Sequence, residues 1–125
     1  MSETIKEYKI RPYKREYTDK SKLIRDFYIL MSAFNNIMLT KRELDLITHI
    51  SLYGGIASVT SKKIYLDTYH ATIGSIDNII MRLKRKKLLV KVDGKIRVNP
   101  AIDTDFSNDK HIITFKCQMK QPENE

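Results

Sequence analysis

Apolar side chains recur at spacings of three and four residues in four successive stretches of the chain, which predicts four amphipathic helices. The first stretch covers residues 21–38, with Asp19 or Ser21 as its N-cap. Its apolar stripe is too broad for a free surface, so we expect this helix to lie in the core or to pair two subunits. The preceding residues 1–20 show no clear period, and we expect an arm with a short strand around Tyr8–Ile10.

The second stretch carries signals at both ends. Thr40 is the expected N-cap, Glu43 stands three residues later as its capping-box partner, and Gly54-Gly55 end the helix. The apolar spacing predicts an inward face made of Leu44, Ile47, Ile50 and Leu52.

The third stretch predicts a short helix that begins at Thr60 or Ser61 and ends near His70. We expect Ile64 and Leu66 to turn inward. The fourth helix follows almost at once, capped by Thr72 and ending near Lys87. Helical spacing assigns its buried face to Ile73, Ile76, Ile79-Ile80 and Leu83.

Residues 88–98 predict a β-hairpin, because two β-prone runs flank Val92-Asp93-Gly94. A two-residue turn at Asp93-Gly94 would mix apolar and charged side chains on each face. A three-residue loop with Gly94 in the left-handed conformation separates them, and pairs Lys91 with Lys95. We therefore predict the three-residue loop. A bound anion would reduce the repulsion between the two paired lysines on the charged face of this hairpin. Its apolar face would consist of Leu88, Val90, Ile96 and Val98.

A polar connection after Pro100 leads to a β-prone run at residues 111–119, which predicts a strand, and then to a frayed tail. The pattern as a whole indicates a mainly α fold with a small β-sheet. We expect an arm at 1–20, one domain over 21–100 that includes the leading helix, and a C-terminal extension at 101–125.

The net charge of +8 is unevenly distributed. Residues 71–100 hold eight basic and two acidic side chains, whereas residues 101–125 hold three basic and five acidic ones. A concentrated basic patch attracts nucleic acid, acidic lipid headgroups or an acidic protein surface. Charge alone does not distinguish DNA from RNA.

Other features narrow the class of protein. No apolar run is long enough to span a membrane, the N-terminus has no secretory signal, and the single Cys117 fits a reducing compartment, so we expect a cytoplasmic protein. The abundance of Ile and Lys suggests an AT-rich genome, hence a bacterium or a phage. His49, His70 and His111 show no metal-ligand spacing, and no nucleotide-binding or hydrolase motif occurs. We expect no enzyme activity, no metal and no cofactor.

Residues 40–100 resemble the winged helix-turn-helix DNA-binding domains of bacterial and phage regulators and replication initiators. The resemblance lies in the segment SKKIYLDTYHATIGSIDNIIMRLKRKKLLVKVDGKIRVNP, which has a short helix, a turn, a Ser/Thr-capped helix with a basic end, and a hairpin. Its GKIRVNP ending is similar to the second wing strand of such initiators. The resemblance implies a winged helix over residues 40–100, and the flanking patterns add an extra N-terminal helix and a C-terminal strand to it. It also implies a transcription or replication regulator that binds double-stranded DNA and dimerises through residues 21–38.

In that arrangement the helix that starts after Thr72 enters the major groove, and the hairpin follows the backbone as a wing. With its apolar stripe buried, the helix turns a polar and basic face outward. The base-edge candidates are Thr72, Ser75 and Asn78. The phosphate candidates are Arg82, Arg85, Lys86, Lys91, Lys95 and Arg97.

A second hypothesis starts from two residues of the same helix. Ile73 is apolar and Asp77 is acidic, and neither suits a surface that meets phosphates. The domain would then be a winged-helix protein-interaction module, in a phage particle or a transcription complex, with its basic face against an acidic protein partner and no contact with DNA.

Overall fold

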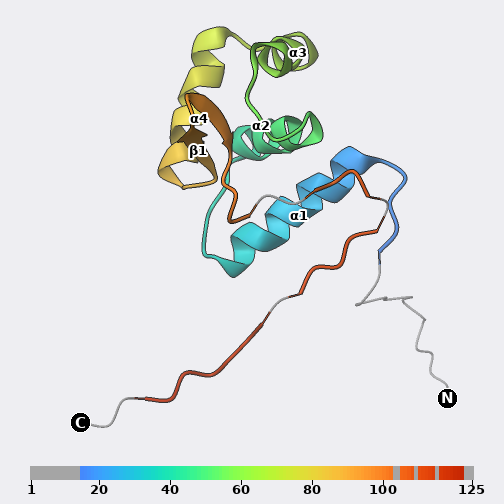
Figure 1. Cartoon of the computed structure of the whole chain (residues 1–125), viewed down its shortest axis with the longest axis vertical. Helices are drawn as coiled ribbons and strands as arrows, with labels where there is room; N and C mark the ends of the chain where they lie inside the picture. Colours follow the sequence, from blue (N-terminus) through green and yellow to red (C-terminus); the bar gives the residue numbers. More distant parts are fainter. Residues whose placement is uncertain (1–14, 103–104, 109, 115, 123–125) are drawn as a thin grey trace, which may run out of the picture.

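The computed structural model describes residues 15–102, 105–108, 110–114 and 116–122. This part of the chain is mainly helical with a small antiparallel sheet, as predicted, and is compatible with a winged helix (Figure 1). The second helix contacts each of the other three helices and also the second strand, so it forms the centre of the domain. The elements are α1 (Lys20–Phe34), α2 (Lys41–Leu52), α3 (Val59–Tyr69), α4 (Ile73–Arg85), β1 (Leu89–Val92) and β2 (Lys95–Val98).

Of the two predicted N-caps of α1, Asp19 is the one observed: its side chain accepts a hydrogen bond from the backbone N–H of Ser21. It ends at Phe34 rather than at residue 38. Asn36 adopts the left-handed conformation (φ 55°), and the N–H of Ile37 bonds to the carbonyl of Ser32 across the helix end. Asparagine tolerates this conformation, which explains why the helix stops before the apolar pattern does.

The inner face of α1 packs on α2, where Ile24 and Tyr28 are fully buried and the Tyr28 hydroxyl lies 2.6 Å from Ser51 Oγ. Its outer face keeps Ile29 and Leu30 46% and 44% exposed. The apolar stripe predicted for this helix is therefore buried on one side and exposed to solvent on the other. Pairing of two subunits through this helix stays a prediction.

The capping box of α2 is confirmed: Glu43 N donates to Thr40 Oγ1, and Thr40 N donates to Glu43 Oε1. The helix ends before Gly54, whose φ of 96° favours glycine. Leu44, Ile47 and Ile50 are buried as predicted, but Leu52 is exposed, because the last turn extends past the core.

Helix α3 starts slightly earlier than predicted, with Ser58 as N-cap, and ends at His70 in the left-handed conformation. Its buried residues are Ser61 and Tyr65, whereas Ile64 and Leu66 are only half-buried. The aromatic ring, not the aliphatic pair, is the main contribution of α3 to the core.

Helix α4 is capped by Thr72 as predicted, and four of its isoleucine and leucine residues are buried. Ile73, which we expected to be buried, is 67% exposed. It is the first residue of the helix, and at 100° per residue it lies at the edge of the buried stripe. The stripe itself consists of Ile76, Ile79, Ile80 and Leu83.

The predicted hairpin is present, but the predicted register is wrong. Val92 pairs with Lys95, so the turn has two residues, Asp93 (φ 52°) and Gly94 (φ 77°). Positive φ at both positions is typical of a type I′ turn, whose twist matches that of the strands. Leu88 lies between α4 and β1: its N–H bonds to the Leu83 carbonyl, and its own carbonyl accepts the N–H of Asn99.

The link between α2 and α3 lies along the outer edge of β2. Ile56 forms an isolated bridge with Arg97, Ala57 N donates to the Ile96 carbonyl, and Val98 N donates to the Gly55 carbonyl. These bonds tie the hairpin to the helices, and they occupy the edge that a further strand would need.

The predicted strand at residues 111–119 is wrong for the residues described, since 111–114 and 116–119 carry no strand. A β-prone run becomes a strand only where it meets a free sheet edge. The extension instead returns to α1 through Phe106, which is 7% exposed and packs edge-on against Phe27. The short strand expected at Tyr8–Ile10 lies outside the described residues. No helix in the described ranges is long and apolar enough to cross a membrane.

Candidate functional site

The basic segment of the sequence lies on two elements that pack together, the end of α4 and the hairpin. The C-terminal half of α4 packs against β1, so the last turns of the helix and the hairpin lie side by side (Figure 1). Five side chains here are exposed and form no ion pair with any residue that the structure describes. They are Lys84, Arg85, Lys87, Lys91 and Lys95; we call them the exposed cation set.

Two of these cations, Lys84 and Lys87, were not among the predicted phosphate contacts. They belong to the same basic run, RLKRKK, as the predicted phosphate contacts Arg82, Arg85 and Lys86. Lys87 has left-handed backbone (φ 63°) at the point where α4 turns into the hairpin, which a helical projection does not anticipate.

Two other predicted phosphate contacts, Arg82 and Lys86, form ion pairs with a residue of the protein itself. Glu43 is fully buried, with Lys86 Nζ 2.6 Å from its Oε1 and Arg82 Nε 3.3 Å from its Oε2. Lys86 also donates to the backbone carbonyl of Met38. Arg82 and Lys86 therefore fasten α4 to the start of α2, and their charge is partly neutralised.

Several contacts act on the charge of Glu43. Burial raises the pKa of this carboxyl, but the hydrogen bond from Lys86, the backbone N–H of Thr40 and the Lys86 charge together outweigh burial and lower the pKa. Glu43 is thus held as a carboxylate. Its Oε2 makes no hydrogen bond in the described structure, so the ion pair with Arg82 is its only compensation there.

The outward face of α4 differs from the predicted one. Asn78 and Arg85 are exposed and two turns apart, so they share a face opposite the core. Ser75 is half-buried and lies with Arg82 and Lys86 on the flank toward α2. Of the three base-edge candidates, Asn78 is the one whose side chain projects freely from the helix.

Thr72 is exposed, but its hydroxyl already has a partner. Its Oγ1 accepts a hydrogen bond from Ser75 N at 3.2 Å and so caps the helix. Beside it, Ile73 is 67% exposed, and Asp77 is also exposed. The N-terminal turn of α4 therefore presents an apolar side chain next to a capping hydroxyl.

The corrected register changes the hairpin surface. Lys91 lies opposite Ile96 and Lys95 lies opposite Val92, so the two lysines do not face each other as predicted. Both remain exposed near the turn. Arg97 is half-buried and bridged to Ile56, which makes it less accessible than the two lysines.

His49 is buried in the core and contacts only groups of the fold in the described structure. It is 7% exposed, its Nε2 lies 2.9 Å from the Ser61 carbonyl, and its ring contacts those of Tyr53 and Tyr65. Nε2 must carry a proton to donate to a carbonyl. Within the described ranges, no three His, Cys, Asp or Glu side chains gather as a metal site requires.

Comparison with known proteins finds no match among protein-family models, curated proteins or solved structures.

Proposed function

We propose that this chain binds double-stranded DNA through α4 and the hairpin, in the manner of a winged helix. The order of elements supports this: α2, a short paired segment at Ile56, α3, α4 and a two-stranded hairpin. The observation that carries the proposal is the exposed cation set, which gathers on adjoining elements without acidic partners among the described residues. A regulator of transcription or replication in a bacterium or phage is the class that fits this architecture.

In the proposed complex, α4 lies in the major groove, which is wide enough for a helix. The Asn78 amide would meet a base edge, and adenine is the base that an asparagine amide reads with two hydrogen bonds. Arg85 and the neighbouring lysines would contact phosphates, and Lys91 and Lys95 would hold the backbone from the wing. Arg82 and Lys86 would act mainly by orienting α4, because Glu43 engages both.

Fluorescence anisotropy with a labelled duplex tests this proposal. Lys95→Ala and Arg85→Ala should each weaken binding roughly 3- to 10-fold, because each removes one phosphate contact. Lys22→Ala is the matched control: it removes an exposed lysine at the N-terminal end of α1, far from the hairpin in Figure 1, and should leave affinity unchanged. Equal losses in all three variants would contradict the assigned face.

A second function is favoured by the apolar groups that α4 exposes. Ile73 is 67% exposed and Met81 is 51% exposed, and apolar side chains of this kind suit a protein partner better than a phosphate backbone. The chain would then dock an acidic protein surface. Ile73→Asp should abolish capture of such a partner, whereas duplex binding would be absent even at low salt.

A further inference from the structure

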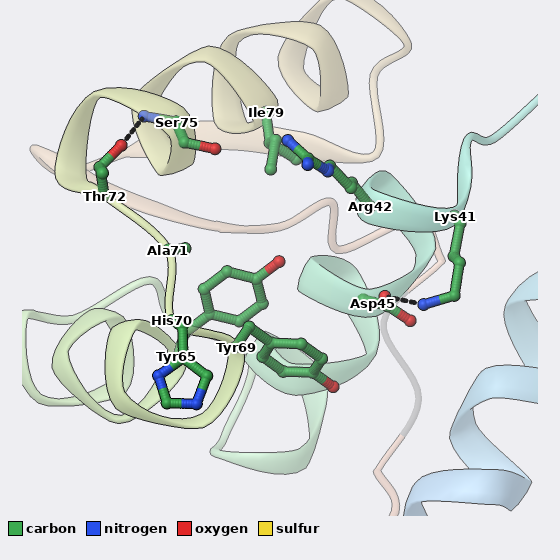
Figure 2. A pocket seen from close by; sticks show the side chains of 10 residues that line it. All are labelled: Lys41, Arg42, Asp45, Tyr65, Tyr69, His70, Ala71, Thr72, Ser75 and Ile79. Carbon is green, nitrogen blue, oxygen red and sulfur yellow. Dashed lines mark hydrogen bonds and ion pairs between the residues drawn. The ribbon is translucent and has the colours of Figure 1, made fainter.

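A pocket of about 390 Å³ lies where three helices meet: the first turn of α2, the end of α3 and the start of α4 (Figure 2). Its volume falls in the range of pockets that hold small molecules. Hydroxyl groups and cations line most of it, and Ile79 contributes an apolar floor.

Tyr65 gives the pocket a hydrogen-bond donor on a largely buried side chain. Its side chain comes from α3 and is 3% exposed, and its ring stacks on that of Tyr69 with centroids 4.5 Å apart. Figure 2 shows both rings directed from α3 into the space between the helices. The Tyr65 hydroxyl makes no hydrogen bond to any residue that the structure describes, and its oxygen is not sealed from solvent, so it can donate to a molecule in the pocket. Burial and the negative charge of Asp45 raise the pKa of Tyr65, so the hydroxyl keeps its proton and can donate it.

The charge of the pocket is positive. Asp45 is 7% exposed but is paired with both Arg25 and Lys41, so its charge is compensated. Arg42 is exposed, has no ion pair within the described part of the chain, and extends across the pocket toward Ile79 in Figure 2. A guanidinium presents several N–H donors in a fork that matches phosphate oxygens.

The start of α4 is a third feature of the pocket that favours an anion. The first N–H groups of a helix have no partner inside the helix, and the helix dipole favours negative charge there. Thr72 satisfies one of these groups, that of Ser75, and both residues line the pocket. Helix terminus, free guanidinium and unpartnered hydroxyl thus converge from three elements.

We propose that this pocket binds a phosphate group, with Arg42 and the Tyr65 hydroxyl as donors and the first turn of α4 as the third side. The volume exceeds that of one phosphate, so the organic part of the ligand has room beside the stacked tyrosines and Ile79. The phosphate comes either from a small phosphate ester or from a nucleic-acid backbone. The site does not depend on the proposed DNA binding, since it can be measured without DNA.

Isothermal titration of the full chain with inorganic phosphate and with adenosine monophosphate tests the site directly. Arg42→Gln should weaken the observed binding at least 10-fold, because a charged donor is lost. Tyr65→Phe should weaken it about 3- to 10-fold, since only the hydroxyl is removed. Tyr53→Phe is the control, because Tyr53 is exposed and lies outside the pocket. Thermal melting of each variant verifies that the fold is kept.

Duplex binding by the same variants separates the two sources. Loss of duplex affinity in Arg42→Gln, with no binding of the free probes, assigns the pocket to a backbone phosphate. Binding of the free probes with unchanged duplex affinity assigns it to a small ester. The proposal is overturned if the wild-type chain binds neither probe at millimolar concentration and Arg42→Gln keeps full duplex affinity. Absence of duplex binding alone would remove the proposed function and leave the pocket standing.

Discussion

The carboxylate of Glu43 contacts Lys86 and Arg82 of α4 while its side chain also accepts the backbone N–H of Thr40. The capping role could be predicted from the spacing of Thr40 and Glu43 alone. The ion pairs could not, because they join residues that are distant in sequence and become neighbours only when α4 packs on α2. One side chain therefore both starts a helix and orients another.

Replacement of Glu43 by glutamine tests this double role. We expect Glu43→Gln to lower the free energy of unfolding by about 1–3 kcal/mol, because the buried partner of two cations loses its charge. The same change should strengthen duplex binding, since Arg82 and Lys86 become available to phosphates. Urea denaturation and anisotropy measure the two effects.

Glu16→Gln is the matched control, because Glu16 is exposed and forms no ion pair with any described residue. It should change neither quantity by more than experimental error. A Glu43→Gln protein that is less stable but binds DNA no better would show that Arg82 and Lys86 have no access to phosphates.

His49 should make stability depend on pH. Burial lowers its pKa more than the Ser61 carbonyl raises it, so the folded protein binds a proton less readily than the unfolded chain. The free energy of unfolding should be highest above a pH of about 6.5 and fall as the pH drops below that value. Urea denaturation between pH 7.5 and 5.5 measures the slope. His49→Gln should flatten it, and a slope that persists in this variant would assign the effect to another group.

Helix ends and the tight turn show where local sequence determines an element and where it does not. The caps at Thr40 and Thr72 were predicted correctly, and Asp19 was one of two predicted caps for α1, because each capping bond joins residues two or three apart. The predicted hairpin register is wrong, because the preference of Asp93-Gly94 for a two-residue type I′ turn outweighs the separation of apolar and charged faces. Leu88 is buried, but it connects α4 to β1 and precedes the strand, so it does not belong to the predicted apolar face of the hairpin.

Two glycines offer a matched pair of alanine substitutions at this scale. Gly94 has a φ of 77°, so Gly94→Ala should destabilise the protein by about 1 kcal/mol through backbone strain alone, because an added Cβ meets no atom within 4 Å. Gly74 lies in α4 with ordinary helical backbone and equally open surroundings. Gly74→Ala should therefore stabilise by roughly 0.5–1 kcal/mol. Opposite signs are expected in urea denaturation, and equal signs would contradict the turn geometry.

At the scale of the whole molecule, α2 joins the two halves: α1 packs on one side of it, and α4 and the hairpin pack elsewhere on it (Figure 1). The sequence predicted the order of the elements and the concentration of charge near the hairpin. It did not predict which cations remain exposed, because that depends on Glu43 and on the corrected register. It also did not predict the pocket, whose walls come from three separate helices.

The salt dependence of duplex binding tests the central claim most directly. If the exposed cation set meets the backbone, the logarithm of the binding constant should fall linearly with the logarithm of salt concentration, with a slope of about −4 to −5 for five phosphate contacts. Lys95→Ala should reduce the magnitude of the slope by about one, and Lys22→Ala should not change it. No binding at low salt, or a slope that is unaffected by Lys95→Ala, would contradict the account.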